Sequence, residues 1–127
     1  MRKQTGFTLI ELLMVIVILG ILAAMVIPRF IDISSKSREN TAKAVLGAVR
    51  AAVAVRYSSN VTYDTGDTIP TTLEAAMFQD DSIPIEILTE STNIEYGDTA
   101  PTGSTGGWKY STLTGRVWIN HTDYSSY

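Results

Sequence analysis

The stretch "FTLIELLMVIVILGILAAMVIP", residues 7–28, decides the fold of this chain. From Phe7 to Ile27 it contains a single charged residue, Glu11. At 1.5 Å per residue, a helix of about 20 residues spans roughly 30 Å, which is the thickness of the hydrocarbon core of a bilayer. The stretch is therefore predicted to form a transmembrane helix, and any account of function has to explain a carboxylate near its start.

The six residues before this helix, "MRKQTG", form a short basic leader at residues 1–6. Arg2 and Lys3 give the leader two positive charges. Because basic flanks stay on the cytoplasmic side of a membrane helix, the N-terminus is predicted to be cytoplasmic.

Residues 29–57 are predicted to continue the helix as an amphipathic segment. Apolar residues recur there at spacings of three and four. Lys36, Lys43 and Arg50 recur every seven residues and are predicted to lie on the opposite side. The helix is predicted to end at "YSSN", residues 57–60. The predicted apolar face holds Ala42, Val45, Ala48, Val49, Ala52 and Val53.

Two residues weaken this long helix. Pro28 lacks an amide hydrogen and clashes with the preceding turn, which predicts a kink. Gly20 has low helix propensity. The segment between Gly20 and Pro28 is therefore the part predicted to bend or melt.

Residues 58–127 are predicted to form a small globular head. "TTLE" at residues 71–74 fits a capping box, with Thr71 as the cap and Glu74 reaching back, and it predicts a short helix at residues 71–78. Strands are predicted at residues 85–89, 93–96, 108–112 and 117–120, the last two joined by a hairpin turn that uses Gly115.

The predicted fold class is α+β. A long N-terminal helical spine has a protruding transmembrane half, kinked near Pro28, and a small antiparallel β-sheet head packs on its C-terminal half. About 70 residues without a disulfide bury a modest core, so the head is expected to need the apolar face of the spine to complete it.

Glu11 admits three interpretations. A cleavable secretory signal would need a shorter apolar stretch and a small-residue cut site, and an early acid is unfavourable there. A plain membrane anchor leaves Glu11 unexplained, since a charged side chain in lipid costs on the order of 2–3 kcal/mol. The third interpretation is that processing creates a charged partner, because cutting after Gly6 would free an α-amine on Phe7.

In a bundle of such helices, the amine of one copy would pair with Glu11 of a neighbour. A carboxylate in an apolar core is tolerated when it is paired. A subunit stacked at the wrong height would bury an uncompensated charge, so the pair would set the axial register of each copy. On this interpretation Glu11 is an assembly residue.

The N-terminal pattern "KQTG" followed by "FTLIELLMVIVILGILAAMVIP" resembles the signature of type IV pilins and type II secretion pseudopilins. This resemblance covers about residues 2–30. It implies cleavage between Gly6 and Phe7 by a prepilin peptidase that also N-methylates Phe7, an assembly role for Glu11, and loss of helical structure near Gly20 and Pro28. The segment at residues 28–53 is similar to major pilins.

The resemblance also implies partners and a location. The precursor would sit in the bacterial inner membrane with a cytoplasmic N-terminus, in contact with the lipid bilayer. An assembly platform with its ATPase would then extrude it, with minor pilins, into a helical homopolymer. The expected function is a type IV pilus subunit for adhesion, motility or surface attachment, in an extracellular filament. The alternative is a periplasmic pseudopilus of a type II secretion system.

Catalytic and metal sites are not predicted. The sequence shows no Ser/His/Asp set, phosphate-binding glycine loop or metal-ligand spacing, and no cofactor is expected. An anchored enzyme or binding domain is the remote alternative. His121 is interpreted as a surface residue, and the acids of "DTGD" (residues 64–67) and "DD" (residues 80–81) as solvated loops rather than a calcium site. The chain has no cysteine, so strand pairing or neighbouring copies are expected to hold the edge of the head, which many pilins close with a disulfide.

Charge is distributed unevenly along the chain. Between Arg29 and Arg56, six basic residues accompany two acidic ones, whereas from Tyr57 onward ten acidic residues accompany two basic ones. This pattern leaves two interpretations open, complementary surfaces on neighbouring copies or an ordinary solvated surface. An acidic head disfavours nucleic-acid binding, so no specific nucleic acid is predicted as a partner.

Overall fold

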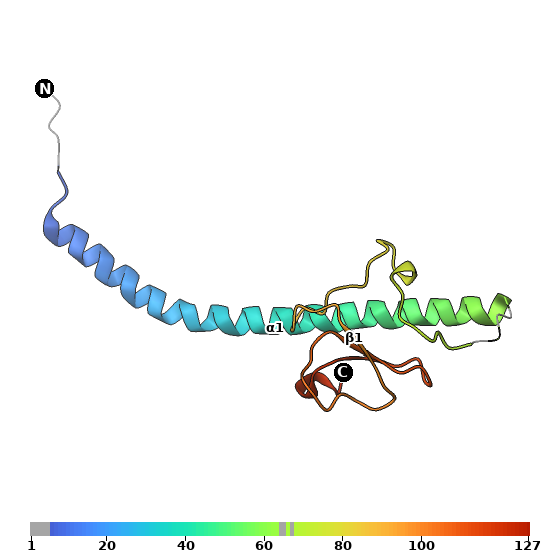
Figure 1. Cartoon of the computed structure of the whole chain (residues 1–127). Coiled ribbons are helices and arrows are strands. Elements are labelled where there is room, and N and C mark those ends of the chain that lie inside the picture. The colour runs from blue at the N-terminus through green and yellow to red at the C-terminus, as the bar shows by residue number, and fades with distance from the viewer. Residues whose placement is uncertain (1–5, 64–65, 67) are drawn as a thin grey trace, which may run out of the picture. The chain divides into compact units, whose positions relative to one another are not determined.

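One long helix and a small sheet make up the computed structural model, which describes residues 6–63, 66 and 68–127. Helix α1 (Leu9–Tyr63) is followed by the 3-10 helix η1 (Ala75–Met77), then by strands β1 (Ile94–Tyr96), β2 (Trp108–Tyr110) and β3 (Val117–Ile119), and by the 3-10 helix η2 (Thr122–Tyr124). Two units divide the chain, one ending at Ser37 and one spanning Arg38–Tyr127. In the second unit the strands and loops gather beside the C-terminal part of α1 (Figure 1).

Helix α1 runs without a break through Gly20 and Pro28. Melting near these residues therefore stays a prediction. The helix also continues past residue 57, where the sequence predicted its end. Two hydroxyl side chains in its last turns bond to carbonyls one turn earlier, Ser58 to Ala54 O at 3.0 Å and Thr62 to Ser58 O at 2.8 Å. Such back-bonding lets Ser and Thr remain inside a helix.

The core lies between one face of α1 and the sheet. Ala42, Leu46, Val49 and Val53 are at most 5% exposed and form this face. Opposite them lie Leu73 and the sheet residues Trp108, Tyr110, Val117 and Ile119. The predicted apolar face was correct for Ala42, Val49 and Val53 but wrong for Ala48, which is exposed, and it missed Leu46. Residues 42, 46, 49 and 53 keep a strict four-three-four spacing, which aligns them on a single stripe.

The sheet has the order β1-β2-β3 and is mixed. β2 and β3 pair antiparallel, with Trp108 opposite Ile119. β1 and β2 pair parallel, with Ile94 opposite Trp108, so the prediction of an antiparallel sheet was wrong for this pair. The loop at residues 97–107 explains the difference. It is long enough to carry the chain back across the sheet, which a parallel pair requires and a tight hairpin does not.

The β2–β3 hairpin forms as predicted. Its turn contains Gly115 at φ +69, and its ends are joined by a bond of 2.9 Å from the amide of Ser111 to the carbonyl of Arg116. A positive φ favours glycine, which has no Cβ to clash in this conformation. The sequence thus located both strands and the turn between them.

Two other predicted elements do not form. The helix predicted at residues 71–78 is reduced to η1, and the Glu74 side chain accepts a bond from Thr72 instead of closing a box with Thr71. Residues 85–89 are not a strand, because Glu86 forms only an isolated bridge with Ser91. The buried Glu86 carboxylate instead accepts hydrogen bonds from the amides of Leu88 and Thr89, which folds this segment into a turn.

Candidate functional site

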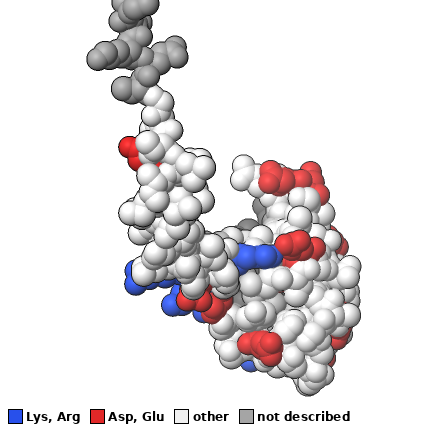
Figure 2. Space-filling view, turned by 90° about the vertical axis from the view of Figure 1, so that its left-hand side faces the viewer, with Lys and Arg blue, Asp and Glu red and all other residues white. Residues whose placement is uncertain are grey.

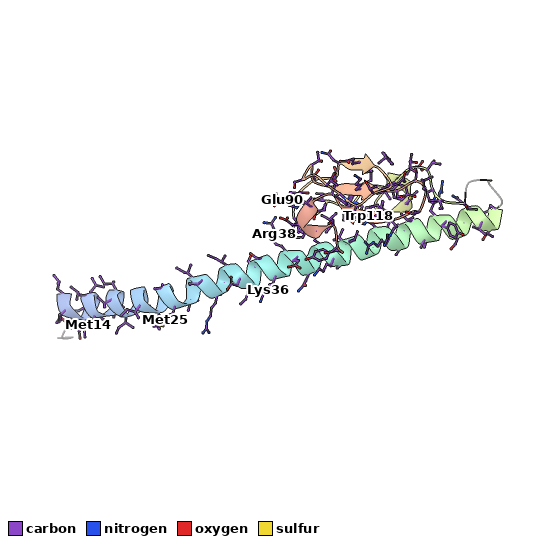
Figure 3. All side chains as sticks on the ribbon, turned by 90° about the horizontal axis from the view of Figure 1, so that it is seen from below. Met14, Met25, Lys36, Arg38, Glu90 and Trp118 are labelled. Atoms are coloured by element: carbon purple, nitrogen blue, oxygen red, sulfur yellow. The ribbon has the colours of Figure 1, made fainter. Side chains whose placement is uncertain are left out.

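The N-terminal part of α1 exposes an extensive apolar surface. Every large apolar side chain in residues 7–33 is at least 45% exposed. The helix is long and apolar enough to cross a membrane, and its most apolar stretch lies near the N-terminus. Met14 and Met25 project from this part of the ribbon into open space (Figure 3). A surface of this size marks contact with lipid or with other protein chains.

Glu11 takes part in capping the N-terminus of this helix. Its Oε2 accepts hydrogen bonds from the Thr8 amide at 2.8 Å and the Thr8 hydroxyl at 2.7 Å. In return, the Glu11 amide donates to the Thr8 hydroxyl at 3.3 Å. This reciprocal arrangement is a capping box, and it satisfies amides that would otherwise be unpaired at the helix start.

Sequence reasoning missed this capping box. The signal was present, because "TLIE" at residues 8–11 has the same spacing as the "TTLE" motif that was interpreted as a box farther along. Glu11 therefore has a local role in the single chain. Only Oε2 is bonded to a described residue, which leaves Oε1 available to a second partner.

Gly6 and Phe7 precede the helix in exposed backbone, and the Phe7 side chain is 81% exposed. The bond between these residues therefore lies in exposed backbone just before the cap of the helix. The leader residues 1–5 lie outside the described residues, as do Asp64 and Asp67 of the predicted solvated loop.

Gly20 has no packing requirement within the described chain. A Cβ added there would meet nothing within 4 Å. Around it the helix surface is uncharged, and Figure 2 shows this part of the molecule white except for one red patch. Glu11 is thus a single carboxylate on a surface that otherwise offers only apolar contacts.

Comparison with known proteins agrees with this geometry. The family model for the prokaryotic N-terminal methylation motif matches residues 1–27. The type IV narrow pilus major component PilA5 of Thermus thermophilus is 50% identical over 53 residues, which are 42% of this chain and 46% of that protein. The type IV major pilin PilA of Myxococcus xanthus is 49% identical over 47 residues, 37% of this chain and 21% of that protein.

A type II secretion protein is also similar. The core protein G of Vibrio cholerae is 42% identical over 67 residues, which are 53% of this chain and 46% of that protein.

The N-terminal part of the chain carries the prokaryotic N-terminal methylation motif and is similar to type IV pilins and to type II secretion core protein G.

The chain spans less than half of the length of these relatives. No solved structure matches the chain. The motif match lies entirely within the N-terminal part of the chain, so the head is described by its own contacts.

The three basic residues predicted on the opposite side of α1, Lys36, Lys43 and Arg50, do not form a separate surface that faces away from the head. Arg50 points toward the sheet and donates two bonds to the Val117 carbonyl, at 3.1 and 2.9 Å. Lys43 pairs with Glu39 at 2.8 Å. At least two members of the stripe therefore serve the subunit's own fold, which weakens the case for charge complementarity between copies through these residues.

Another charged contact ties a loop of the head to α1. Arg38 donates to the Ile87 carbonyl at 3.0 Å and pairs with Glu90 at 2.7 Å. Arg38 and Glu90 lie next to each other in Figure 3. Glu90 has φ +53, a conformation that L residues rarely adopt, so the ion pair is made from a constrained turn.

A network of polar side chains joins the three strands through Glu95 on β1, Lys109 on β2 and Asn120 directly after β3. Glu95 accepts bonds from Asn120 at 3.0 Å and Lys109 at 3.1 Å, and its pKa is lowered chiefly by these two hydrogen bonds. Asn120 is 2% exposed, so its amide is held inside the folded head. The Nδ1 atom of His121 lies 3.8 Å from the Asp123 carboxylate, and its ring lies 5.2 Å from that of Tyr124.

Proposed function

We propose that this chain is the structural subunit of a type IV pilus, which polymerises into a filament for adhesion, motility or surface attachment. The exposed apolar segment with its single carboxylate supports this proposal most strongly. In lipid or in a bundle of identical helices, the same side chains are equally well buried. Transfer from the membrane to the filament would therefore cost little free energy.

Processing would create the second charge. Cleavage between Gly6 and Phe7 by a prepilin peptidase, followed by N-methylation of Phe7, leaves a cationic amine at the new N-terminus. The amine of one copy would then reach Glu11 of its neighbour. Because Thr8 is bonded to Oε2 alone, Oε1 can accept the amine while the capping box stays closed.

The pair would set the axial position of each subunit. An unpaired carboxylate inside a bundle of helices is costly, whereas a paired one is tolerated. A subunit that stops one turn too high or too low leaves both charges unpaired. The energetic difference between correct and incorrect register is therefore concentrated on one contact, and the apolar side chains around it supply the cohesion.

The partners follow from this route. The precursor would wait in the inner membrane with its N-terminus in the cytoplasm, and an assembly platform with its ATPase would extract it, together with minor pilins. The subunit itself would carry out no catalysis, since the methylation motif marks a substrate of another protein. No cofactor or specific nucleic acid is proposed.

A pseudopilin of a type II secretion system is the second candidate. The core protein G of Pseudomonas aeruginosa is 42% identical over 62 residues, and its V. cholerae counterpart aligns over 67 residues. The same helix and Glu11 would then build a periplasmic filament that drives protein export. The two functions share the processing and the register contact, and they differ in filament length and location.

The test is recovery of filaments sheared from cells, with mass spectrometry of the subunit N-terminus. The proposal expects long surface fibres whose subunits begin with N-methylated Phe7. Fibres that form only on overexpression, with the same processed N-terminus, would support the pseudopilin function instead. A monomeric protein that keeps residues 1–6 while functional would refute both.

A further inference from the structure

The last seven residues of the chain reach back to α1. The segment at residues 121–127, which contains η2, follows β3 directly. None of its residues is fully buried. Tyr124 and Tyr127 are partly buried against the core, and their rings lie 5.8 Å apart. The segment therefore covers the core without forming part of the sheet.

Three charged residues of α1 converge on Tyr127. Its hydroxyl donates a hydrogen bond to Glu39, and the Nζ atom of Lys43 lies 4.0 Å from its ring centroid. Arg50 donates to its main-chain oxygen at 2.6 Å. Positions 39, 43 and 50 are four and seven residues apart, which places them along one stripe of the helix. A single tyrosine is thus held at its hydroxyl, its ring and its backbone.

We propose that residues 121–127 form a strap, closed by a catch of Glu39, Lys43 and Arg50, which opens as a unit before the sheet unfolds. Beyond the catch, the strap is held by few contacts. Thr122 donates to the Gly103 carbonyl at 3.0 Å, and its hydroxyl lies 3.2 Å from that of Ser104. Segments with few buried apolar groups and exposed hydrogen bonds are the ones that open locally, below the free energy of global unfolding.

Arg50 links the catch to the sheet. The same guanidinium that holds Tyr127 also donates to the Val117 carbonyl on β3, which is an edge strand in the order β1-β2-β3. Burial lowers the pKa of Arg50, and the nearby Arg116 lowers it further. Opening the strap would uncover the stripe of Glu39, Lys43 and Arg50 and loosen the cover of this edge.

The protonation of Tyr127 provides a probe of the strap. The hydrogen bond to Glu39 raises the Tyr127 pKa most, followed by burial and the charge of Glu39, while Lys43 lowers it. Glu39 also raises the pKa of Lys43. Tyr124 of η2 packs its ring against that of Tyr127, and His121, the residue before η2, packs its ring against that of Tyr124. Because the pKa of Tyr127 is raised, its contact stabilises the closed strap at neutral pH and is lost as the pH rises above about 10.

Hydrogen exchange of the full chain in detergent micelles, followed by mass spectrometry, tests the strap directly. At pH 8, Tyr127→Phe keeps the ring and the backbone contacts but loses the hydrogen bond from the Tyr127 hydroxyl to Glu39. We expect exchange in residues 121–127 to become about tenfold faster or more, with β2 unchanged. Tyr124→Phe is the matched control, because its hydroxyl bonds to no described residue, and it should exchange like the wild type.

Raising the pH separates the strap from the sheet. In the wild type, protection of residues 121–127 relative to intrinsic exchange should fall before that of β2, whereas Tyr127→Phe should show no such step. Glu39→Gln retains an acceptor without the charge, so its strap should stay closed at pH 8 and open at a lower pH than in the wild type. Equal protection in Tyr127→Phe and the wild type, or simultaneous loss in strap and sheet, would overturn the proposal.

Discussion

Helix α1 contains two regions that use apolar residues in opposite ways. In residues 7–33 the large apolar side chains are all at least 45% exposed. In the second region, which begins at Arg38, the four residues Ala42, Leu46, Val49 and Val53 are at most 5% exposed. The first region is far more apolar than the second, yet it buries nothing in the single chain. Burial depends on whether a partner surface is present, and only the second region finds one within its own chain.

Charge separates the two regions in the same way. The second region places Arg38, Glu39, Lys43 and Arg50 at positions where each contacts the head. The first region has Glu11 alone before Arg29. Charges beside a folded head have local partners, while the isolated carboxylate has only its capping box. Under the proposed function, lipid or neighbouring copies would supply the contacts that the first region lacks within its own chain.

The largest difference between the two regions is expected for the substitution of one leucine in each by alanine. Leu46→Ala should destabilise the head by about 2–5 kcal/mol, because it leaves a cavity in a packed core. Leu19→Ala removes the same atoms from a side chain that is 58% exposed and should change head stability by less than about 0.5 kcal/mol. Urea unfolding in detergent, followed by the fluorescence of Trp108 and Trp118, measures both. Equal losses would show that the two regions are not distinct.

Matched glycines give the next largest effect. A Cβ at Gly107 would lie 2.2 Å from the Asn93 carbonyl oxygen, and its φ is +77, so Gly107→Ala should cost about 1–3 kcal/mol. A Cβ at Gly47 meets nothing within 4 Å in a regular helix, so Gly47→Ala should stabilise by about 0.5–1 kcal/mol. Thermal unfolding of the two variants decides the matter, and the same sign of change in both would contradict the structure.

Acid should weaken the head through Glu95. Its lowered pKa means that its contacts with Asn120 and Lys109 stabilise the head above the pKa of the unfolded chain, near 4, and lose this contribution as the pH falls through the lower folded value. Unfolding midpoints measured between pH 6 and about 2.5 should therefore fall less steeply in Glu95→Gln. Glu74→Gln, which changes an exposed loop carboxylate, is the control. A Glu95→Gln profile parallel to the wild type would contradict the assignment.

The smallest effect is expected at the ion pair of Arg38 and Glu90. Both side chains are at least half exposed, so the pair should contribute less than about 1 kcal/mol, and less still at high salt. Arg38→Gln and Glu90→Gln, combined in a double-mutant cycle at low and high salt, measure the coupling. A coupling that does not decrease with salt would show that the pair is better shielded than the structure indicates.

The sequence predicted those features that depend on local pattern. The long apolar run specified the helix, and the spacing of β-branched and aromatic residues around Gly115 specified the hairpin. The start of the helix at Leu9 is also predictable from the sequence, since Thr8 and Glu11 have capping-box spacing. The same residue, Glu11, supplies both the cap and the isolated charge of this helix.

The features that sequence failed to predict depend on distant contacts. The parallel pairing of β1 with β2 is set by the path of the loop at residues 97–107, which no local pattern encodes. The strand predicted at residues 85–89 became a turn because the buried Glu86 bonds to nearby amides, a choice that depends on burial. Arg50 was assigned to the wrong side because its length lets it reach the Val117 carbonyl from the flank of the helix.

The role of Glu11 in assembly needs a variant that separates its charge from its cap. Glutamine at the same position keeps the oxygen that accepts from Thr8 and is equally suited to a capping box, but it carries no charge. Thr8→Val is the complementary control, because it removes the hydroxyl of the cap and leaves the Glu11 charge intact. Both variants should still be processed and accumulate in the membrane.

The most direct test of the account is the yield of sheared filaments from Glu11→Gln cells, normalised to the membrane pool of processed subunit. The charge pair predicts a decrease of about tenfold or more for Glu11→Gln, corresponding to one lost buried ion pair per subunit, and near-normal yield for Thr8→Val. Wild-type yield from Glu11→Gln would contradict the claim that Glu11 sets the register through its charge.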